Sequence, residues 1–84
     1  MRQTELMTPN DLHELSFVRG LCSSGEARTI RVTADVGLTE ISDAIGVRSQ
    51  TVWRWENQRR TPTGPPALRY AALMRVLAKE TSAR

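Results

Sequence analysis

The segment from residue 49 to 54 combines hydrogen-bonding and aromatic side chains on one expected helix face. At about 100° per residue, Gln50, Trp53 and Arg54 fall within about one third of the helix circumference. A glutamine amide can form two hydrogen bonds to adenine, and an arginine guanidinium can form two to guanine. Ser49 can donate to or accept from a base or a phosphate. This segment therefore has the chemistry needed to read base edges of double-stranded DNA.

The two tryptophans in this segment are expected to have different environments. Trp55 lies three residues after Val52, which predicts that both side chains face the core. Trp53 lies on the polar face, where a large exposed aromatic side chain costs solubility unless something covers it. We count Trp53 with the base-reading residues, because a thymine methyl or a sugar could cover it. Packing inside the protein is the open alternative, since tryptophan is usually largely buried.

Capping signals and apolar spacing place this segment in an all-α chain, which we interpret as one domain over residues 1–84. We expect an N-terminal helix over about 9–21, where Thr8-Pro9-Asn10-Asp11 supplies a capping hydroxyl and a first-turn proline. A second capping box at Ser23-Ser24-Gly25-Glu26 predicts a helix that ends near Asp35. The other helices are expected over about 38–45, 49–57 and 66–79.

Only three residues, Gly46, Val47 and Arg48, separate the expected helices at 38–45 and 49–57. Glycine readily adopts the left-handed backbone that ends a helix, and an apolar valine can fill the angle between two helices. This spacing predicts a helix-turn-helix over about 38–57, in which the second helix enters the major groove.

Basic residues are concentrated in the second part of the chain. Residues 1–47 carry four basic and seven acidic side chains, a net charge of −3, whereas residues 48–84 carry eight basic and two acidic, a net charge of +6. A basic region of this kind is typical of proteins that bind a polyanion, because each cation placed on a phosphate releases condensed counterions. A solvated run of charges is the competing interpretation.

The pattern of a known family is present in two stretches, Leu38-Thr39-Glu40-Ile41-Ser42-Asp43-Ala44-Ile45-Gly46-Val47 and Thr51-Val52-Trp53-Arg54-Trp55-Glu56-Asn57. Through them the chain from about Gly25 to Leu77 resembles the Xre/Cro family of phage and bacterial repressors. The resemblance implies a compact five-helix, lambda-repressor-like domain that binds operator DNA, in most members as a homodimer. We expect a Cro-like repressor of transcription. Activators and antitoxins share the same DNA-binding helix, so the sign of regulation stays open.

The resemblance also implies roles for individual residues. The family's base-reading positions correspond to Ser49, Gln50 and Arg54, and its structural salt bridge corresponds to Arg31 and Glu56. Its phosphate-binding loop corresponds to the residues after the second helix of the motif. Together with further expected phosphate contacts, the candidates for DNA backbone binding are Arg28, Thr39, Arg48, Asn57, Arg59, Arg60 and Thr61.

Two positions depart from the family pattern. Leu38 stands where most members have a glutamine that contacts phosphate, and Arg48 stands where they have serine or threonine. Because arginine cannot cap a helix N-terminus as a hydroxyl does, we expect Arg48 to contact phosphate itself.

The last expected helix is apolar on more than one face. Either the N-terminal helix covers the excess or a second copy of the chain does. We expect a homodimer, because a two-fold dimer would set two DNA-reading helices about 34 Å apart. The rival function is an antitoxin-like module, in which these apolar helices bind a protein partner and DNA binding is secondary. The apolar residues concerned are Leu68, Tyr70, Ala71, Leu73, Met74, Val76 and Leu77.

Composition argues against several other classes of protein. One histidine, one cysteine and scattered carboxylates offer no nucleophile with its base, no phosphate-cradling glycine loop and no metal ligand set. We therefore expect no enzyme, no cofactor and no metal. No apolar run reaches the ~18 to 20 residues of a membrane span, and the first residues lack a signal-peptide pattern, which predicts a cytoplasmic protein.

Overall fold

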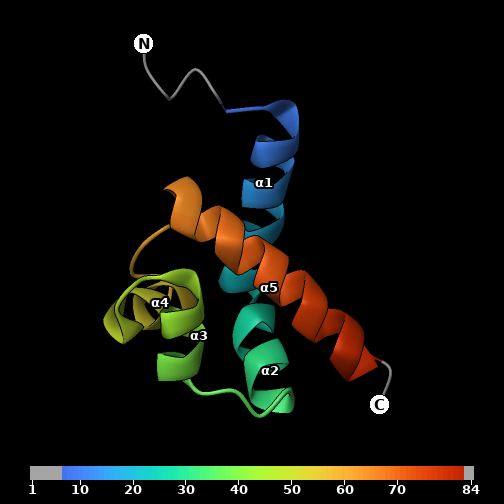
Figure 1. The fold of residues 1–84 in the computed structure, drawn as a ribbon, viewed down its shortest axis with the longest axis vertical. Helices are drawn as coiled ribbons and strands as arrows, with labels where there is room; N and C mark the ends of the chain where they lie inside the picture. The colour runs from blue at the N-terminus through green and yellow to red at the C-terminus, as the bar shows by residue number, and fades with distance from the viewer. Residues whose placement is uncertain (1–6, 83–84) are drawn as a thin grey trace.

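The computed structural model describes residues 7–82 and confirms the expected all-helical class with five helices. Figure 1 shows α5 crossing in front of α1 and α2, with α3 and α4 together on one side of it. No strand occurs within the described range. The helices are α1 (Pro9–Ser24), α2 (Glu26–Thr33), α3 (Leu38–Ile45), α4 (Ser49–Glu56) and α5 (Gly64–Ser82).

The end of α1 differs from the expectation of about residue 21. The helix continues through Gly20 to Ser24, and Gly25 ends it with a left-handed φ of 85° while also starting α2. The capping box expected at residues 23–26 is therefore wrong, because both serines lie inside α1. Burial of Cys22 against the core explains the extra turn, since a tertiary contact outweighs the modest cost of one helical glycine.

α5 is also longer than the expected 66–79. It begins at Gly64 and ends at Ser82. Pro65 and Pro66 occupy its first turn, where the missing N–H groups would have no helical partner in any case. The prolines thus belong to the start of the helix.

The core lies where α5 meets the other helices. Tyr70 and Met74 of α5 are fully buried, and the Tyr70 ring packs on that of Trp55 from α4 with centroids 5.1 Å apart. Phe17 and Leu21 of α1 border this cluster. The core therefore joins α4 to α1 and α5 directly. Its buried members are Val18, Cys22, Ala27, Ile41, Ile45, Val52, Trp55, Tyr70, Ala71 and Met74.

Most of the apolar surface of α5 is covered within the chain, by α1 and α2. Leu68, Leu73 and Leu77 are half-buried, and of the seven apolar residues of α5 named above, Val76 alone is exposed. The N-terminal helix thus covers this helix, as in the first expected alternative, with α2 adding to α1, and the homodimer stays a prediction.

The hydroxyl of Tyr70 is a local weakness of this core. It is fully buried and has no hydrogen-bond partner among the described residues, and the nearby thiol of Cys22 is only a weak hydrogen-bonding group. An unsatisfied buried hydroxyl costs about 1–3 kcal/mol. Tyr70→Phe keeps the ring packing and is expected to raise the free energy of unfolding by about 1 kcal/mol, measured by urea titration. A loss of stability would show that the hydroxyl is satisfied in solution.

Candidate nucleic-acid interface

The turn between α3 and α4 is fixed by hydrogen bonds to the end of α3. Gly46 adopts a φ of 80°, and the N–H groups of Gly46 and Val47 both donate to the carbonyl of Ser42, at 2.8 and 3.0 Å. From α5, Nε of Arg69 donates to the carbonyl of Ile45 at 2.9 Å. The carbonyl groups of Ser42 and Ile45 at the end of α3 are therefore satisfied, and Arg69 ties the turn to α5.

α4 has a buried face and an exposed face. Val52 is fully buried and Trp55 is 5% exposed, as their spacing predicts. Ser49 and Gln50 are exposed at the start of the helix, and Trp53 is 44% exposed. The interior packing considered for Trp53 is therefore not adopted, and an aromatic side chain stands on the solvent side of a short helix.

A guanidinium group lies over this exposed tryptophan. The Cζ atom of Arg59 is 6.0 Å from the ring centroid of Trp53, at the outer limit of a cation–π contact. Arg54, on the same helix, is half-buried. Aromatic and cationic groups thus share one surface at the end of α4.

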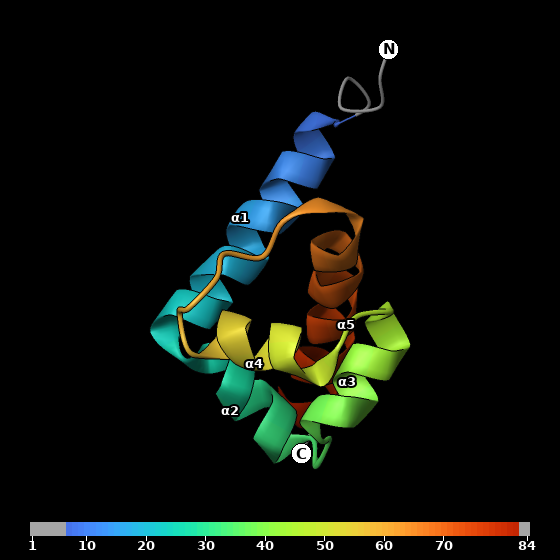
Figure 2. The ribbon, with the colours of Figure 1, turned by 90° about the vertical axis from the view of Figure 1, so that its left-hand side faces the viewer.

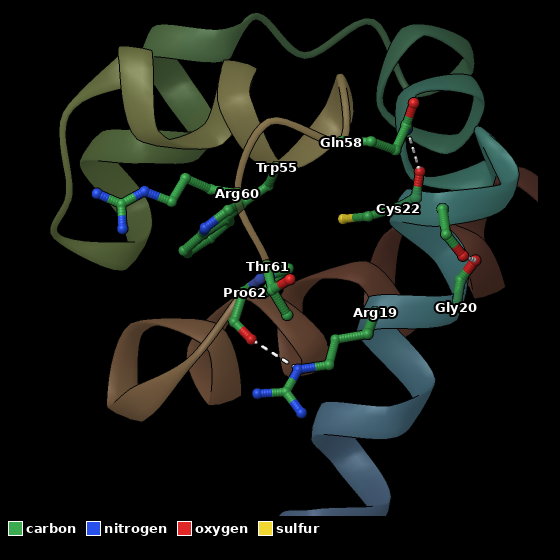
Figure 3. A pocket seen from close by; sticks show the side chains of 9 residues that line it. Arg19, Gly20, Cys22, Trp55, Gln58, Arg60, Thr61 and Pro62 are labelled. Carbon is green, nitrogen blue, oxygen red and sulfur yellow. Dashed lines mark hydrogen bonds between the residues drawn. The ribbon is translucent and has the colours of Figure 1, made fainter.

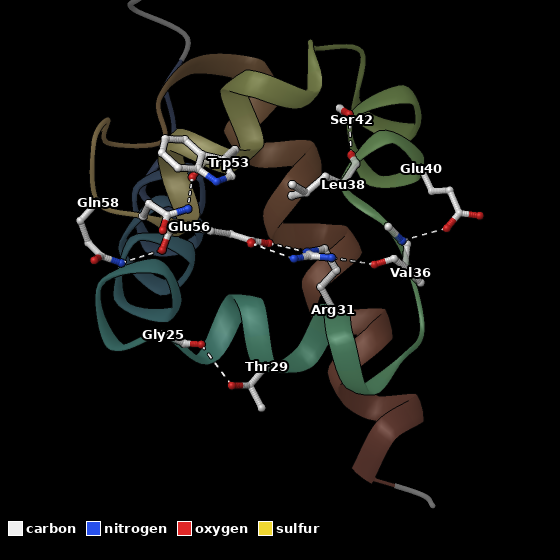
Figure 4. A network of polar contacts seen from close by, with 12 residues as sticks. Gly25, Thr29, Arg31, Val36, Leu38, Glu40, Ser42, Trp53, Glu56 and Gln58 are labelled. Carbon is white, nitrogen blue, oxygen red and sulfur yellow. Dashed lines mark hydrogen bonds and ion pairs between the residues drawn. The ribbon is translucent and has the colours of Figure 1, made fainter.

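A buried ion pair attaches α4 to α2. Nε and Nη2 of Arg31 donate to the two carboxylate oxygens of Glu56 at 2.7 and 3.1 Å, and its Nη1 donates to the carbonyl of Val36 at 3.0 Å. Figure 4 shows the guanidinium between these two acceptors. Its hydrogen bonds to Glu56, partly opposed by burial, raise the pKa of Arg31. This is the pair expected from the sequence, and it leaves Glu56 no free charge to repel a polyanion.

The segment after α4 is tied to α1. Gln58 has a left-handed φ of 56°, and its Nε2 donates to the carbonyls of Cys22 and Glu56, both at 2.7 Å. Nε of Arg19 donates to the carbonyl of Pro62 at 2.8 Å. Figure 2 shows the resulting path, in which the segment runs along α1 before α5 begins. The loop that follows α4 is thus braced at two points.

A hollow of about 290 Å³, here called the α4–α5 hollow, lies beside α4. Five of its lining side chains carry hydroxyl or guanidinium donors, and none of the five donates to another described residue. Among described residues, no acidic side chain lines it. Such a set of unpartnered donors suits an anion. The lining residues are Val47, Thr51, Arg54, Trp55, Arg60, Thr61, Thr63 and Pro66.

The structure gathers only some of the expected phosphate-binding residues at this place. Arg60 and Thr61 line the α4–α5 hollow, whereas Arg48 is exposed at the start of α4. Arg28 on α2 and Thr39 on α3 are exposed and do not line this hollow.

Asn57 uses its side-chain amide within the protein. Its Nδ2 donates to the carbonyl of Trp53 at 2.8 Å, which caps the end of α4. At most its side-chain oxygen remains available to another molecule.

Part of the basic charge of the second half is used inside the protein. Arg69 donates to the carbonyl of Ile45, and Arg75 forms an ion pair with Glu14 at 2.9 Å. The sequence did not predict these two roles, nor the hydrogen bond of Arg19 to the carbonyl of Pro62. A distant backbone carbonyl that accepts a hydrogen bond leaves no pattern in the sequence. The basic surface is therefore narrower than the charge count implies, and it centres on α4 and its loop.

A second hollow of about 350 Å³, here called the α1 hollow, lies on the other side of the loop. Figure 3 shows Cys22 and Gln58 at one end of it and Arg19 at the other. The lining residues are Arg19, Gly20, Cys22, Ser23, Trp55, Gln58, Arg60, Thr61 and Pro62.

Cys22 is expected to be unreactive although it borders this hollow. Burial raises the pKa of its thiol from 9.0 to about 11. At pH 8 the thiolate fraction falls roughly a hundredfold, and the thiolate is the nucleophile. Alkylation by iodoacetamide at pH 8 should therefore be roughly a hundredfold slower in the folded protein than in 6 M guanidinium chloride, as measured by mass spectrometry. Comparable rates in the two states would contradict a buried, protonated thiol.

Within residues 7–82, no cluster of histidine, cysteine and carboxylate side chains has the arrangement of a metal site. No helix in that range is both long enough and apolar enough to cross a bilayer. Searches against protein-family models, curated proteins and solved structures gave no match to this chain.

Proposed function

We propose that this protein is a sequence-specific regulator of transcription that binds double-stranded DNA. In this proposal α3, the turn and α4 act as a lambda-repressor-like helix-turn-helix, and α4 enters the major groove. The observation that carries the proposal is the exposed face of α4, where Ser49, Gln50 and Trp53 point away from the core. Beside this face lies the α4–α5 hollow, whose lining has hydroxyl and guanidinium donors without partners among the described residues and no acidic side chain.

The two parts of this surface support different kinds of contact. Gln50 and Ser49 stand at the first turn of α4, the part of such a helix that reaches base edges. The α4–α5 hollow offers Thr51, Arg60 and Thr63 to a backbone phosphate. A helix that reads bases next to a site that holds a phosphate would fix the register of the protein on the duplex.

The rival function, an antitoxin-like module whose apolar helices bind a protein, has less support. α1 and α2 cover most of α5, so little of its apolar surface is left for a partner. The large exposed apolar side chains of these helices are divided among Leu12 on α1, Val32 on α2 and Val76 on α5. We keep a Cro-like homodimer within the proposal, as the arrangement that would present two copies of α4 to successive major grooves.

The test is selection of bound duplexes from a random-sequence pool at about 150 mM salt, where non-specific binding weakens. The proposal requires that a sequence motif is enriched. An inverted repeat with half-site centres about 10 base pairs apart would support a dimer, and a single ungapped site would support a monomer. If nothing is enriched and binding disappears as salt rises, the protein does not read sequence and the proposal is wrong.

A further inference from the structure

The α1 hollow has the electrostatic character of an anion site. Arg19 reaches it from α1 and Arg60 from the loop, and among described residues no acidic side chain lines it. Its volume of about 350 Å³ lies at the small end of the range for ligand sites. A compact anion would therefore meet cationic residues in the lining of this hollow and no carboxylate that repels it.

Several polar groups of the lining are already in use, and a smaller set is left over. Nε2 of Gln58 already donates to the carbonyls of Cys22 and Glu56, and the hydroxyl of Ser23 donates to the carbonyl of Gly20 at 3.2 Å. Arg19 uses only its Nε, for the carbonyl of Pro62. Its two Nη groups have no acceptor among the described residues. The bond to the carbonyl holds the guanidinium in place while these outer groups stay available.

Arg60 and Thr61 add donors of the same kind. Neither side chain donates to another described residue. Figure 3 shows that Arg19 reaches the loop from α1, whereas Arg60 lies on the loop and its side chain extends away from Arg19. The free donors therefore come from two parts of the chain that are 41 residues apart in sequence but meet at this loop.

We propose that the α1 hollow binds a small anion of the phosphate or phosphomonoester class. The Nη groups of Arg19 supply the fixed donors, because planar guanidinium groups match the oxygens of a phosphate. The hydroxyl of Thr61 adds a further donor, and the guanidinium of Arg60, which extends away from Arg19 in Figure 3, completes the set when it turns toward the hollow.

The position of this site links it to DNA binding, a step that rests on the proposed function. Arg60 and Thr61 line the α1 hollow and the α4–α5 hollow alike. One guanidinium can face only one of the two hollows at a time. An anion held in the α1 hollow would draw Arg60 away from the DNA phosphate and weaken operator binding, so the anion acts as a negative effector.

The anion site is tested without DNA by titrating the protein with inorganic phosphate and following backbone amides by NMR, with chloride at equal ionic strength as reference. Saturable shifts are expected at Arg19, Ser23 and residues 58–61. Ser23→Asp places a negative charge in the lining and should weaken phosphate binding at least tenfold. Ser24→Asp is the matched control, since it makes the same charge change one residue outside the lining, and should change binding less than twofold.

A second variant protects this test against a folding defect. Arg60 is exposed and has no partner among residues 7–82, so Arg60→Gln should leave the melting temperature unchanged and weaken phosphate binding at least threefold. The inference is wrong if no saturation is observed, if both serine variants weaken binding equally, or if the shifts occur only around Thr51 and Arg54 of the other hollow.

The link to DNA is measured with the selected operator duplex. Phosphate should lower operator affinity at least threefold beyond the effect of chloride at equal ionic strength, and Ser23→Asp should remove this sensitivity. If instead a longer duplex gains affinity and Ser23→Asp abolishes the gain, the hollow holds a phosphate of flanking DNA and the free-anion site is overturned. Failure to enrich any operator would refute the proposed function while leaving the phosphate titration decisive for the anion site.

Discussion

Arg31→Ala is expected to lower the free energy of unfolding by about 3–5 kcal/mol, because it leaves the carboxylate of Glu56 buried without its partner. The side chain of Glu56 is only 1% exposed, and that of Arg31 is 12% exposed. The variant also removes the bond to the carbonyl of Val36, so the segment between α2 and α3 loses its anchor. The measurement is urea unfolding followed by circular dichroism.

The second ion pair of the described residues provides a matched control. Arg75 and Glu14 form the same two-point contact, but their side chains are 44% and 20% exposed. Arg75→Ala should therefore cost much less stability than Arg31→Ala, since exposed pairs contribute little, even though it also removes the guanidinium that lies 3.8 Å from the ring centroid of Phe17. Equal losses in the two variants would show that burial does not govern the effect.

A double variant separates the buried charge from the loss of packing. Arg31→Met combined with Glu56→Leu removes both charges and keeps apolar volume, and should recover most of the stability that Arg31→Ala loses. If the double variant is no more stable than Arg31→Ala, the loss of stability comes from the missing guanidinium contacts and not from the unpaired carboxylate of Glu56.

Gln50→Ala and Arg54→Ala are each expected to reduce discrimination at one base position of the operator by about 1–3 kcal/mol, which is roughly 5- to 150-fold in affinity. Gln50 is exposed at the first turn of α4, so its loss should leave the melting temperature unchanged. The measurement is competition binding against operators that carry each single base change.

The control for this pair is Lys79→Ala, which removes an exposed charge from the last turn of α5. It should lower operator affinity less than twofold. For Arg54, which is half-buried and lines the α4–α5 hollow, a second outcome is informative. Arg54→Ala could instead weaken binding equally for every sequence and lower, by about one, the steepness with which log affinity falls with log salt concentration. Arg54 would then bind a phosphate, and its assignment as a base reader would be wrong.

The sequence predicted the bounds of α3 and the start of α4 because the signals there are local. Gly46 marks the end of one helix, and the apolar spacing of Val52 and Trp55 fixes the inner face of the next. The end of α1 was missed because Gly20 and Gly25 look alike in sequence, and only the packing of Cys22 keeps the helix intact past the first of them.

The candidate site was predicted only in part for a similar reason. The exposure of Gln50 and Trp53 follows from the periodicity of one helix, which sequence alone reveals. The hydrogen bonds of Arg19 and Arg69 join groups that are 43 and 24 residues apart, and their acceptors are backbone carbonyls that any residue carries. Such contacts depend on how α1 and α5 meet the loop and the turn, so no spacing rule predicts them.

These same two bonds have a consequence for the thermodynamics of binding. Arg69 holds the segment that precedes α4 at the carbonyl of Ile45, and Arg19 holds the segment that follows it at the carbonyl of Pro62. Ordering a residue costs about 1–2 kcal/mol in backbone entropy. Because both flanks of α4 are ordered in the free protein, this cost falls on folding and not on association. α4 is therefore preorganised, and in the proposed complex with DNA more of its contact energy would appear as affinity.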